Sequence, residues 1–232
     1  MSFMRNRLPV LALSVAGVLA SLPGVASAQA SAPQQSADKH EVKLAALPET
    51  GKTAKLEDLV GKTAYEFTLT DTEGKEHKLS EYLGAGKVVV LEWFNSTCPY
   101  VEKQYEGEST MNDTVARYEG KDVVWLAVAS GETAADGEGC QKAREDWGMK
   151  HPVLLDESGA VGKAYGSKNT PTMYVIGTDG TLAYGGAIDD NANGRNKSPT
   201  NYVVAAVDAL LAGSNIETTF AKPYGCGVKY KR

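Results

Sequence analysis

Three side chains of the 232-residue sequence are of types that could act together in thiol chemistry, namely Cys98, Cys226 and Glu92. Cys98 ends a largely apolar run and is followed at once by Pro99, a residue favoured at the first position of a helix. We therefore expect Cys98 at a helix start, where backbone N–H groups favour the thiolate, the nucleophilic form of cysteine. The alternative is a buried structural cysteine, although the junction between a strand and a helix is a poor place to hide a thiol.

Glu92 lies six residues before Cys98, inside the apolar run 88–94 that predicts a buried central strand. An unpaired carboxylate is costly to keep ionised in such a place. We therefore expect Glu92 to take part in proton transfer near the thiol. The alternative is a side chain that faces a polar gap and has no chemical role.

Cys226 stands between Gly225 and Gly227, beyond the last predicted helix. The glycines give this tail freedom to turn and let another chain approach closely. A tail cysteine of this kind could resolve an oxidised Cys98 by forming a disulfide with it. The alternative is a static bridge from Cys226 to Cys98 or to Cys140 that only pins the tail.

Cys140 follows an acidic stretch that contains Asp136 and Glu138. Cys140 opens a predicted helix and could be a second helix-start thiolate, but acidic neighbours disfavour a thiolate, so we expect a structural or spare thiol there. Three cysteines are too few for a framework of structural disulfides. None of His40, His77 and His151 stands at metal-ligand spacing with Cys98, so we expect no metal site and no cofactor.

The N-terminal residues predict export. Arg5 and Arg7 precede an apolar stretch at 8–22, and Ala26-Ser27-Ala28 resembles a signal-peptide cleavage site. We expect a signal peptide at 1–28, a flexible segment at 29–60 and a periplasmic or secreted protein. The apolar stretch is short for a membrane span. No cysteine precedes Cys98, so a lipid anchor attached to a cysteine at the cleavage site is not expected either. The net charge of −5 gives no indication of a nucleic-acid partner.

Strand-like and helix-like patterns alternate along the rest of the chain. Strands are expected at 65–70, 76–79, 122–129, 152–155, 172–176 and 181–184, and helices at 80–83, 99–118, 140–147, 157–165 and 201–211. A glycine- and acid-rich loop is expected at 131–139. This order predicts an α/β fold with a mixed central sheet and helices on both faces, formed by residues 61–213 and followed by a tail at 214–232 that carries Cys226.

Several motifs carry a family resemblance. They are Phe67-Thr-Leu-Thr-Asp71, Trp93-Phe94 with Cys98-Pro99, Leu155-Asp156, Tyr165-Gly166, Thr170-Pro171-Thr172 and Ile176-Gly-Thr-Asp-Gly180. Together they resemble the thioredoxin-like fold, and more narrowly the redoxins of the alkyl hydroperoxide reductase and thiol-specific antioxidant (AhpC/TSA) family. The closing run 222–230 resembles the tail of secreted members of that group.

The resemblance implies a role for each matching residue. Cys98 matches the nucleophile at the helix start, and Glu92 matches the buried acid that assists proton transfer. Thr170-Pro171 matches a cis-proline loop that faces the active cysteine.

Two departures from the family pattern limit what the resemblance implies. Val101 occupies the position of the second cysteine of thioredoxin, so a local disulfide cannot form. Asn95 stands where typical peroxiredoxins have threonine, and it can still donate a hydrogen bond. Pro171 stands in the region where those enzymes carry an arginine.

The leading hypothesis from the sequence is therefore an exported thiol-dependent redox enzyme of the peroxiredoxin type. Cys98 attacks a small peroxide or a protein disulfide, Cys226 resolves the product, and an unidentified exported thiol supplies electrons. The first alternative is a thiol–disulfide oxidoreductase that acts on exported protein thiols. The second is a binding module that has kept the thioredoxin fold without catalysis.

Overall fold

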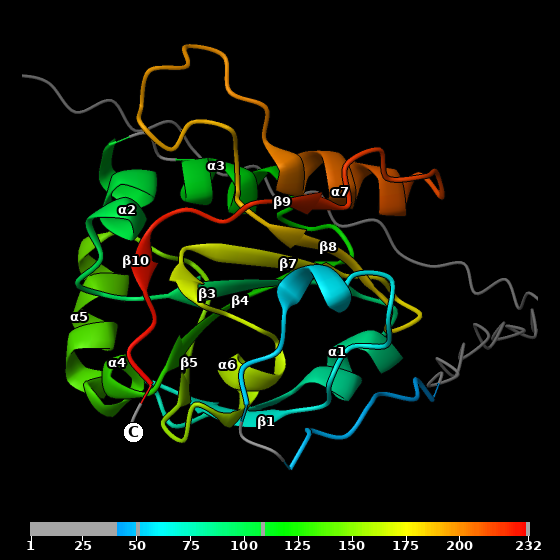
Figure 1. Cartoon of the computed structure of the whole chain (residues 1–232), viewed down its shortest axis with the longest axis horizontal. Helices are drawn as coiled ribbons and strands as arrows, with labels where there is room; N and C mark the ends of the chain where they lie inside the picture. Colours follow the sequence, from blue (N-terminus) through cyan, green and yellow to red (C-terminus); the bar gives the residue numbers. More distant parts are fainter. Residues whose placement is uncertain (1–40, 50–51, 108–109, 231–232) are drawn as a thin grey trace, which may run out of the picture. The chain divides into compact units, whose positions relative to one another are not determined.

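The computed structural model describes residues 41–49, 52–107 and 110–230 of the chain (Figure 1). The predicted signal peptide and residues 29–40 lie outside these described residues, so their predicted roles stay predictions.

The described chain is organised around an eight-stranded mixed sheet with the order β2-β1-β5-β4-β3-β7-β8-β9. The central strand β3 pairs in parallel with β4 and antiparallel with β7. The strands are β1 (Thr68–Asp71), β2 (Glu76–Lys78), β3 (Val88–Phe94), β4 (Val123–Ser130), β5 (Val153–Asp156), β7 (Thr172–Ile176), β8 (Leu182–Gly186) and β9 (Phe220–Ala221). A separate two-stranded pair joins β6 (Asn169–Thr170) to β10 (Cys226–Gly227).

Helices cover both faces of the sheet, which is why every residue of β3 is buried. They are α1 (Leu79–Gly84), α2 (Pro99–Glu102), the π-helical turn η2 (Lys103–Gly107), α3 (Thr110–Arg117), α4 (Glu132–Ala135), α5 (Gly137–Asp146), α6 (Ala160–Ala164) and α7 (Tyr202–Leu211), with a short 3-10 helix η1 (Leu56–Asp58). This arrangement confirms the predicted α/β fold with a mixed central sheet.

Alternation along β3 divides the core into two clusters. Val90 and Phe94 pack with Cys98 and with side chains of α3, α5 and α7. Leu91 and Trp93 pack on the opposite face with α1 and α6. Because side chains alternate along a strand, Glu92 points to the same face as Cys98.

The segment 131–139 differs from its predicted loop structure. It contains α4 and the start of α5, separated by Asp136. The buried side chain of Ala134 anchors α4, and the carboxylate of Asp136 accepts a hydrogen bond from the N–H of Gly139 to cap α5. The prediction failed because glycine and acidic residues, which suggest a loop, here serve as a helix start and a cap.

The described part of the N-terminal segment packs on the domain. The N–H of Ala45 donates to the carbonyl of Ala64, and the carbonyl of Ala45 accepts from the N–H of Glu66. Leu56 is buried in the cluster beneath α1 and α6. Ordered packing therefore begins before the predicted domain start at residue 61, through a few apolar side chains in a polar segment.

The tail returns to the domain in two places. First, β9 adds to the sheet edge beside β8, with Phe220 opposite Gly185. Second, β10, the red strand in Figure 1, pairs antiparallel with β6. None of the helices in the described part of the chain is long and apolar enough to cross a membrane.

Candidate active site

Cys98 occupies the position that the sequence predicts. It is the N-cap of α2, with Pro99 at the first helical position. The residue is only 1% exposed, and its thiol donates a hydrogen bond to the carbonyl oxygen of Thr170 at 3.2 Å. The Thr170–Pro171 peptide bond is cis, as the sequence predicts. The cis-proline loop therefore faces the predicted nucleophile.

The strand pair of β6 and β10 brings Cys226 to Cys98. Cys226 lies directly opposite Thr170 in this ladder, so it shares a neighbour with Cys98. All three cysteines are free thiols, and the thiols of Cys98 and Cys226 lie near enough for each to shift the pKa of the other. The two thiols therefore lie beside each other across Thr170, although they are far apart in the sequence.

The pKa values of the two thiols move in opposite directions. Burial alone would raise the pKa of the Cys98 thiol, but the thiol of Cys226, the side chain of Thr170 and the N–H groups of Val101 and Cys226 stabilise its thiolate, and its pKa is lowered. Burial, together with the neighbouring Cys98 thiolate, raises the pKa of Cys226 to about 11. Because of this asymmetry, Cys98 is the more readily ionised thiol of the pair.

Hydrogen bonds on both sides of Cys226 hold the tail in place. Before it, the Tyr224 hydroxyl donates to a carboxylate oxygen of Asp189 and accepts from the side-chain amide of Gln104. After it, the N–H of Val228 donates to the carbonyl of Lys168 at 3.0 Å. Further along, the Tyr230 hydroxyl donates to the carbonyl of Ser167 at 2.6 Å. These contacts fix the position of Cys226 from both directions.

Gly225 brings the tail backbone unusually close to the cis-proline loop. Its φ is +128°, and a Cβ atom at this position would lie 2.0 Å from the carbonyl oxygen of Thr170. A Cβ at Gly227 would meet only the carbonyl oxygen of Lys168, at 4.0 Å. Of the two glycines that flank Cys226, it is therefore Gly225 whose lack of a side chain permits the docking.

Glu92 is fully buried and belongs to a polar cluster with side chains from three other segments. Its Oε2 atom accepts hydrogen bonds from the Tyr105 hydroxyl at 2.5 Å and from the indole N–H of Trp125 at 3.2 Å. The Nε2 atom of His151 lies 3.7 Å from the same oxygen and 3.1 Å from the Tyr105 oxygen. Sequence reasoning missed these three partners, because nothing in their spacing links them to Glu92.

Asn95 has a different contact from the one expected. Its Oδ1 atom accepts hydrogen bonds from the N–H and the hydroxyl of Thr97 at 2.9 and 3.0 Å, and its carbonyl accepts from the N–H of Cys98. Asn95 therefore shapes the turn that leads into Cys98.

Cys140 lies apart from the dithiol and is fully buried in α5. Its thiol donates to the carbonyl of Thr133, and burial together with Asp136 raises its pKa to about 12. These properties agree with the predicted structural or spare thiol. Among the described residues, no group of His, Cys, Asp and Glu side chains could hold a metal ion.

The sequence matches the AhpC/TSA family over residues 60–185, more than half of the chain. The chain belongs to the AhpC/TSA family. This membership, together with the sheet topology and the cis-proline loop, confirms the predicted thioredoxin-like fold.

One curated relative in this group is the thiol-disulfide oxidoreductase ResA of Geobacillus thermodenitrificans, which is 34% identical over 130 residues, 56% of this chain and 70% of that protein. A crystal structure of a hypothetical protein from Sinorhizobium meliloti 1021 superposes with a TM-score of 0.67 at 28% identity, over 74% of this chain and 94% of that one. The crystal structure of an uncharacterized conserved protein from Geobacillus kaustophilus superposes with a TM-score of 0.63 at 29% identity, over 74% of this chain and 92% of that one. The AhpC/TSA match and the ResA relative agree with the predicted enzyme class, an oxidoreductase.

Proposed function

We propose that this AhpC/TSA protein is a thiol–disulfide oxidoreductase whose redox-active pair is Cys98 and Cys226. The observation that carries the proposal is the position of Cys226 on the tail strand β10, opposite the same Thr170 whose carbonyl accepts the thiol hydrogen of Cys98 at its helix start. The name of the ResA relative supports the same reaction class. The first alternative from the sequence thus has better support than the leading peroxidase hypothesis.

The reaction balances with these two thiols alone. The Cys98 thiolate attacks one sulfur of a substrate disulfide, and the released sulfur takes up a proton as a thiol. Cys226 then gives its proton to a base and attacks the Cys98 sulfur of the mixed disulfide. The second substrate thiol leaves with a proton, and the Cys98–Cys226 disulfide remains. Run in reverse, the oxidised protein converts two substrate thiols into a disulfide.

The side chains around the pair have distinct proposed roles. The cis-proline loop at Thr170 and Pro171 holds Cys98 against the tail, and the N–H of Val101 stabilises its thiolate. Glu92 is the proposed proton acceptor on the Cys98 face of the sheet. Val101 is buried where a local second cysteine would stand, so Cys226 takes that part from the tail.

The peroxidase hypothesis uses the same two cysteines with a peroxide as oxidant. Cys98 would become a sulfenic acid and release an alcohol or water, and Cys226 would condense with it to release water. Pro171 in the region where typical peroxiredoxins have an arginine, and the name of the ResA relative, both weigh against this hypothesis.

Two rapid-kinetic assays separate these functions. The fully reduced protein is mixed with a disulfide, such as insulin, or with hydrogen peroxide, and formation of the Cys98–Cys226 bond is followed in each case. We expect the disulfide to react faster than peroxide at equal concentration, and Cys226→Ser to accumulate a mixed disulfide on Cys98. Faster oxidation by peroxide, with no exchange on insulin, would instead establish a peroxidase. A protein that reacted with neither the disulfide nor the peroxide would support the second alternative, a binding module without catalysis.

We also propose that the protein is exported through residues 1–28 and that its partners are thiols or disulfides of exported proteins, with an exported thiol as electron donor. The signal-peptide motif that ends at Ala28 supports this proposal. A redox role for a pair of cysteines also suits the oxidising periplasm, where disulfides persist. N-terminal sequencing of the protein from a bacterial periplasm tests it, with Gln29 expected as the first residue. Retention of Met1 in that fraction would contradict it.

A further inference from the structure

Two buried polar atoms at opposite ends of the Glu92 cluster lack a hydrogen-bond partner within the described part of the chain. They are Oε1 of Glu92 and Nδ1 of His151. Buried polar atoms are nearly always paired, because an unpaired one loses its hydration without compensation. Two such atoms at the ends of one connected cluster therefore call for an explanation.

The hydrogen bonds between these ends form a continuous chain. The hydroxyl hydrogen of Tyr105 points to Oε2 of Glu92, because that carboxylate oxygen lies 2.5 Å away. The Tyr105 oxygen must then accept from Nε2 of His151, 3.1 Å away, so Nε2 carries the ring hydrogen. In this tautomer Nδ1 of His151 is a free acceptor. Each of the three side chains can therefore take a proton on one side and release one on the other.

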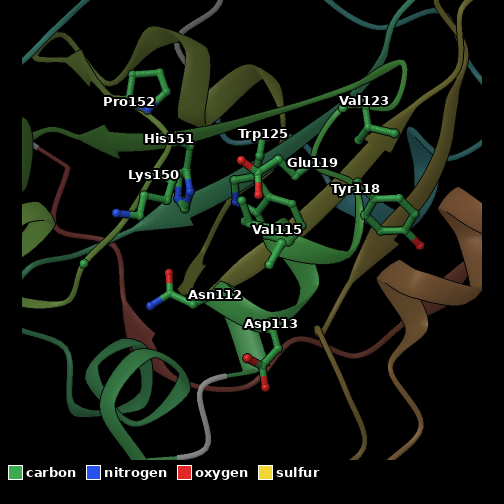
Figure 2. Close-up of a pocket in the computed structure, with 13 residues that line it drawn as sticks. Asn112, Asp113, Val115, Tyr118, Glu119, Val123, Trp125, Lys150, His151 and Pro152 are labelled. Atoms are coloured by element: carbon green, nitrogen blue, oxygen red, sulfur yellow. The ribbon is translucent and has the colours of Figure 1, made fainter. Parts of the chain in front are cut away.

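The His151 end of this chain lies at a pocket. A pocket of about 600 Å³ is lined by Trp125 and His151 together with charged side chains that include Asp113, Glu119 and Lys150 (Figure 2). Trp125 and His151, which are 6% and 4% exposed, both line this pocket and both contact Oε2 of Glu92. The pocket therefore provides an approach to Glu92 from a side that the tail does not cover.

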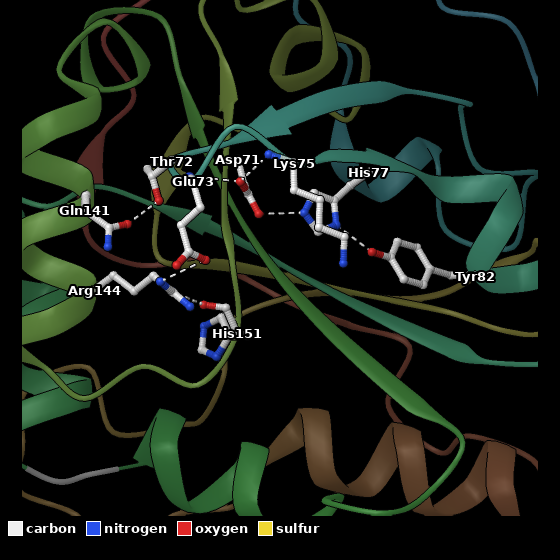
Figure 3. A network of polar contacts seen from close by, with 9 residues as sticks. All are labelled: Asp71, Thr72, Glu73, Lys75, His77, Tyr82, Gln141, Arg144 and His151. Atoms are coloured by element: carbon white, nitrogen blue, oxygen red, sulfur yellow. Dashed lines mark hydrogen bonds and ion pairs between the residues drawn. The ribbon is translucent and has the colours of Figure 1, made fainter.

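A second polar network fixes the backbone of His151. Nε of Arg144 on α5 donates to the carbonyl of His151 at 3.0 Å, and the same guanidinium pairs with Glu73 at 3.2 Å (Figure 3). Glu73 belongs to the turn between β1 and β2. The backbone of His151 is thus held at the pocket wall by Arg144, and Glu73 holds the Arg144 guanidinium in turn.

We propose that His151 and Tyr105 form a proton relay that connects the pocket to Glu92, and through it to the dithiol. The proposal rests on the proposed function, in which Glu92 exchanges protons with the thiols. Cys98 is covered by the tail and Glu92 is fully buried, so the carboxyl group needs a route by which its proton is exchanged with solvent.

The relay step balances without any redox change. A proton from the pocket binds Nδ1 of His151, the Nε2 hydrogen moves to the Tyr105 oxygen, and the Tyr105 hydroxyl hydrogen moves to Oε2 of Glu92. At the same time the proton on Oε1 leaves toward the departing sulfur. When Cys226 later gives a proton to Oε1, the same movements run backward and restore the original histidine tautomer.

Three variants test the relay in the disulfide-exchange assay. Tyr105→Phe removes the central hydroxyl, and His151→Gln removes the ring that exchanges protons. Tyr118→Phe is the matched control, because Tyr118 lines the same pocket but its hydroxyl donates to Asp208 and not to the Glu92 cluster. We expect each of the first two variants to slow exchange roughly 10- to 100-fold, up to the lower end of the range for general acid–base catalysis. Both variants should also show a changed pH–rate profile and a smaller solvent isotope effect. The control should keep the wild-type profile and isotope effect.

His151→Ala gives an independent readout, because it opens the pocket wall. Added imidazole should then restore most of the lost rate in this variant and have no effect on Tyr105→Phe. A wild-type pH profile in Tyr105→Phe, or equal effects in Tyr118→Phe, would overturn the relay while leaving the proposed function intact.

Nuclear magnetic resonance of ring-¹⁵N-labelled protein tests the relay without any activity. The reduced wild-type protein should show His151 as the Nε2–H tautomer, with loss of that preference in Tyr105→Phe. An Nδ1–H tautomer in the wild type would overturn the relay even in an active enzyme. A wild-type protein that exchanged no disulfides would contradict the proposed function. The ¹⁵N spectrum would still show whether His151 has the tautomer that the relay requires.

Discussion

Cys226 lies directly opposite Thr170 in the β10–β6 ladder, and the carbonyl oxygen of the same Thr170 accepts the thiol hydrogen of Cys98 at 3.2 Å. One residue of the cis-proline loop therefore positions both cysteines. The β10–β6 pair therefore places a second thiol beside Cys98, while Val101 occupies the helix position of the second cysteine of thioredoxin.

The first prediction concerns the thiolate of Cys98. Burial would raise its pKa, but hydrogen bonds led by that of the Cys226 thiol outweigh burial and lower it. Cys226→Ala should therefore move the midpoint of Cys98 alkylation by iodoacetamide to higher pH, whereas Cys226→Ser, which keeps a hydroxyl donor, should move it less. Equal midpoints in the wild type and both variants would show that the tail does not stabilise the thiolate.

The second prediction concerns the docking of the tail. Gly225→Ala places a methyl group against the Thr170 carbonyl at a positive φ, a conflict that costs roughly 1–3 kcal/mol. Because each 1.4 kcal/mol is about tenfold in an equilibrium, closure of the Cys98–Cys226 disulfide should fall by about one order of magnitude.

Gly227→Ala is the matched control for this change, since its methyl group meets only one atom at 4.0 Å. Both variants are equilibrated with a mixture of reduced and oxidised glutathione. Mass spectrometry then measures the ratio of the Cys98–Cys226 disulfide to the mixed disulfide between Cys98 and glutathione. Equal behaviour of the two variants would mean that the close approach at Gly225 does not govern the pairing.

The third prediction concerns Glu92. Glu92→Gln keeps the size of the side chain and a hydrogen-bond acceptor for Tyr105 and Trp125, but it cannot exchange a proton in the same way. We expect exchange to slow by roughly 10²-fold and its pH–rate profile to change, as for loss of a general acid–base group. A stable variant with wild-type kinetics at every pH would reduce Glu92 to a structural role.

The fourth prediction concerns acid stability. Burial opposes ionisation of Asp71, but hydrogen bonds led by that of His77 outweigh it and lower the pKa of this carboxyl group in the folded protein (Figure 3). A lowered folded pKa gives stability that is present above the unfolded value, about 3.9, and is lost as pH falls through the folded pKa.

Asp71→Asn should therefore be less stable than the wild type at pH 6, and this difference should shrink below about pH 4. Urea unfolding at pH 6 and pH 3 measures the effect. Asp122→Asn, which removes an exposed ion pair with Lys87, is the control and should change stability by less than about 1 kcal/mol at either pH. A constant difference across the pH range for Asp71→Asn would contradict the linkage.

Much of the fold follows from local patterns in the sequence. The uninterrupted apolar run of β3 predicts a strand buried on both faces, and Cys98 before Pro99 predicts a helix start, as the structure has it. The loop expected at 131–139 is wrong, because Gly131 and Asp136 serve there as a helix start and a helix cap.

The remaining parts of the site depend on contacts between distant segments, which leave no local pattern. Tyr105, Trp125 and His151 meet at Glu92 only because a π-helical turn, β4 and the approach to β5 converge above one face of the sheet. The tail is a similar case. Its glycines suggested freedom to turn and a close approach of another chain, but only the pairing of β10 with β6 shows that Cys226 lies beside the neighbour of Cys98.

The most direct test of the account is the disulfide map of the purified protein after reaction with one equivalent of a disulfide oxidant. Peptide mass spectrometry without reduction should find Cys98 linked to Cys226, with Cys140 as a free thiol because it is buried and its pKa is raised to about 12. Cys140→Ala should give the same map. A link between Cys98 and Cys140, or a dimer bridged through Cys98 in the wild-type protein, would contradict the assignment of the tail thiol as its redox partner.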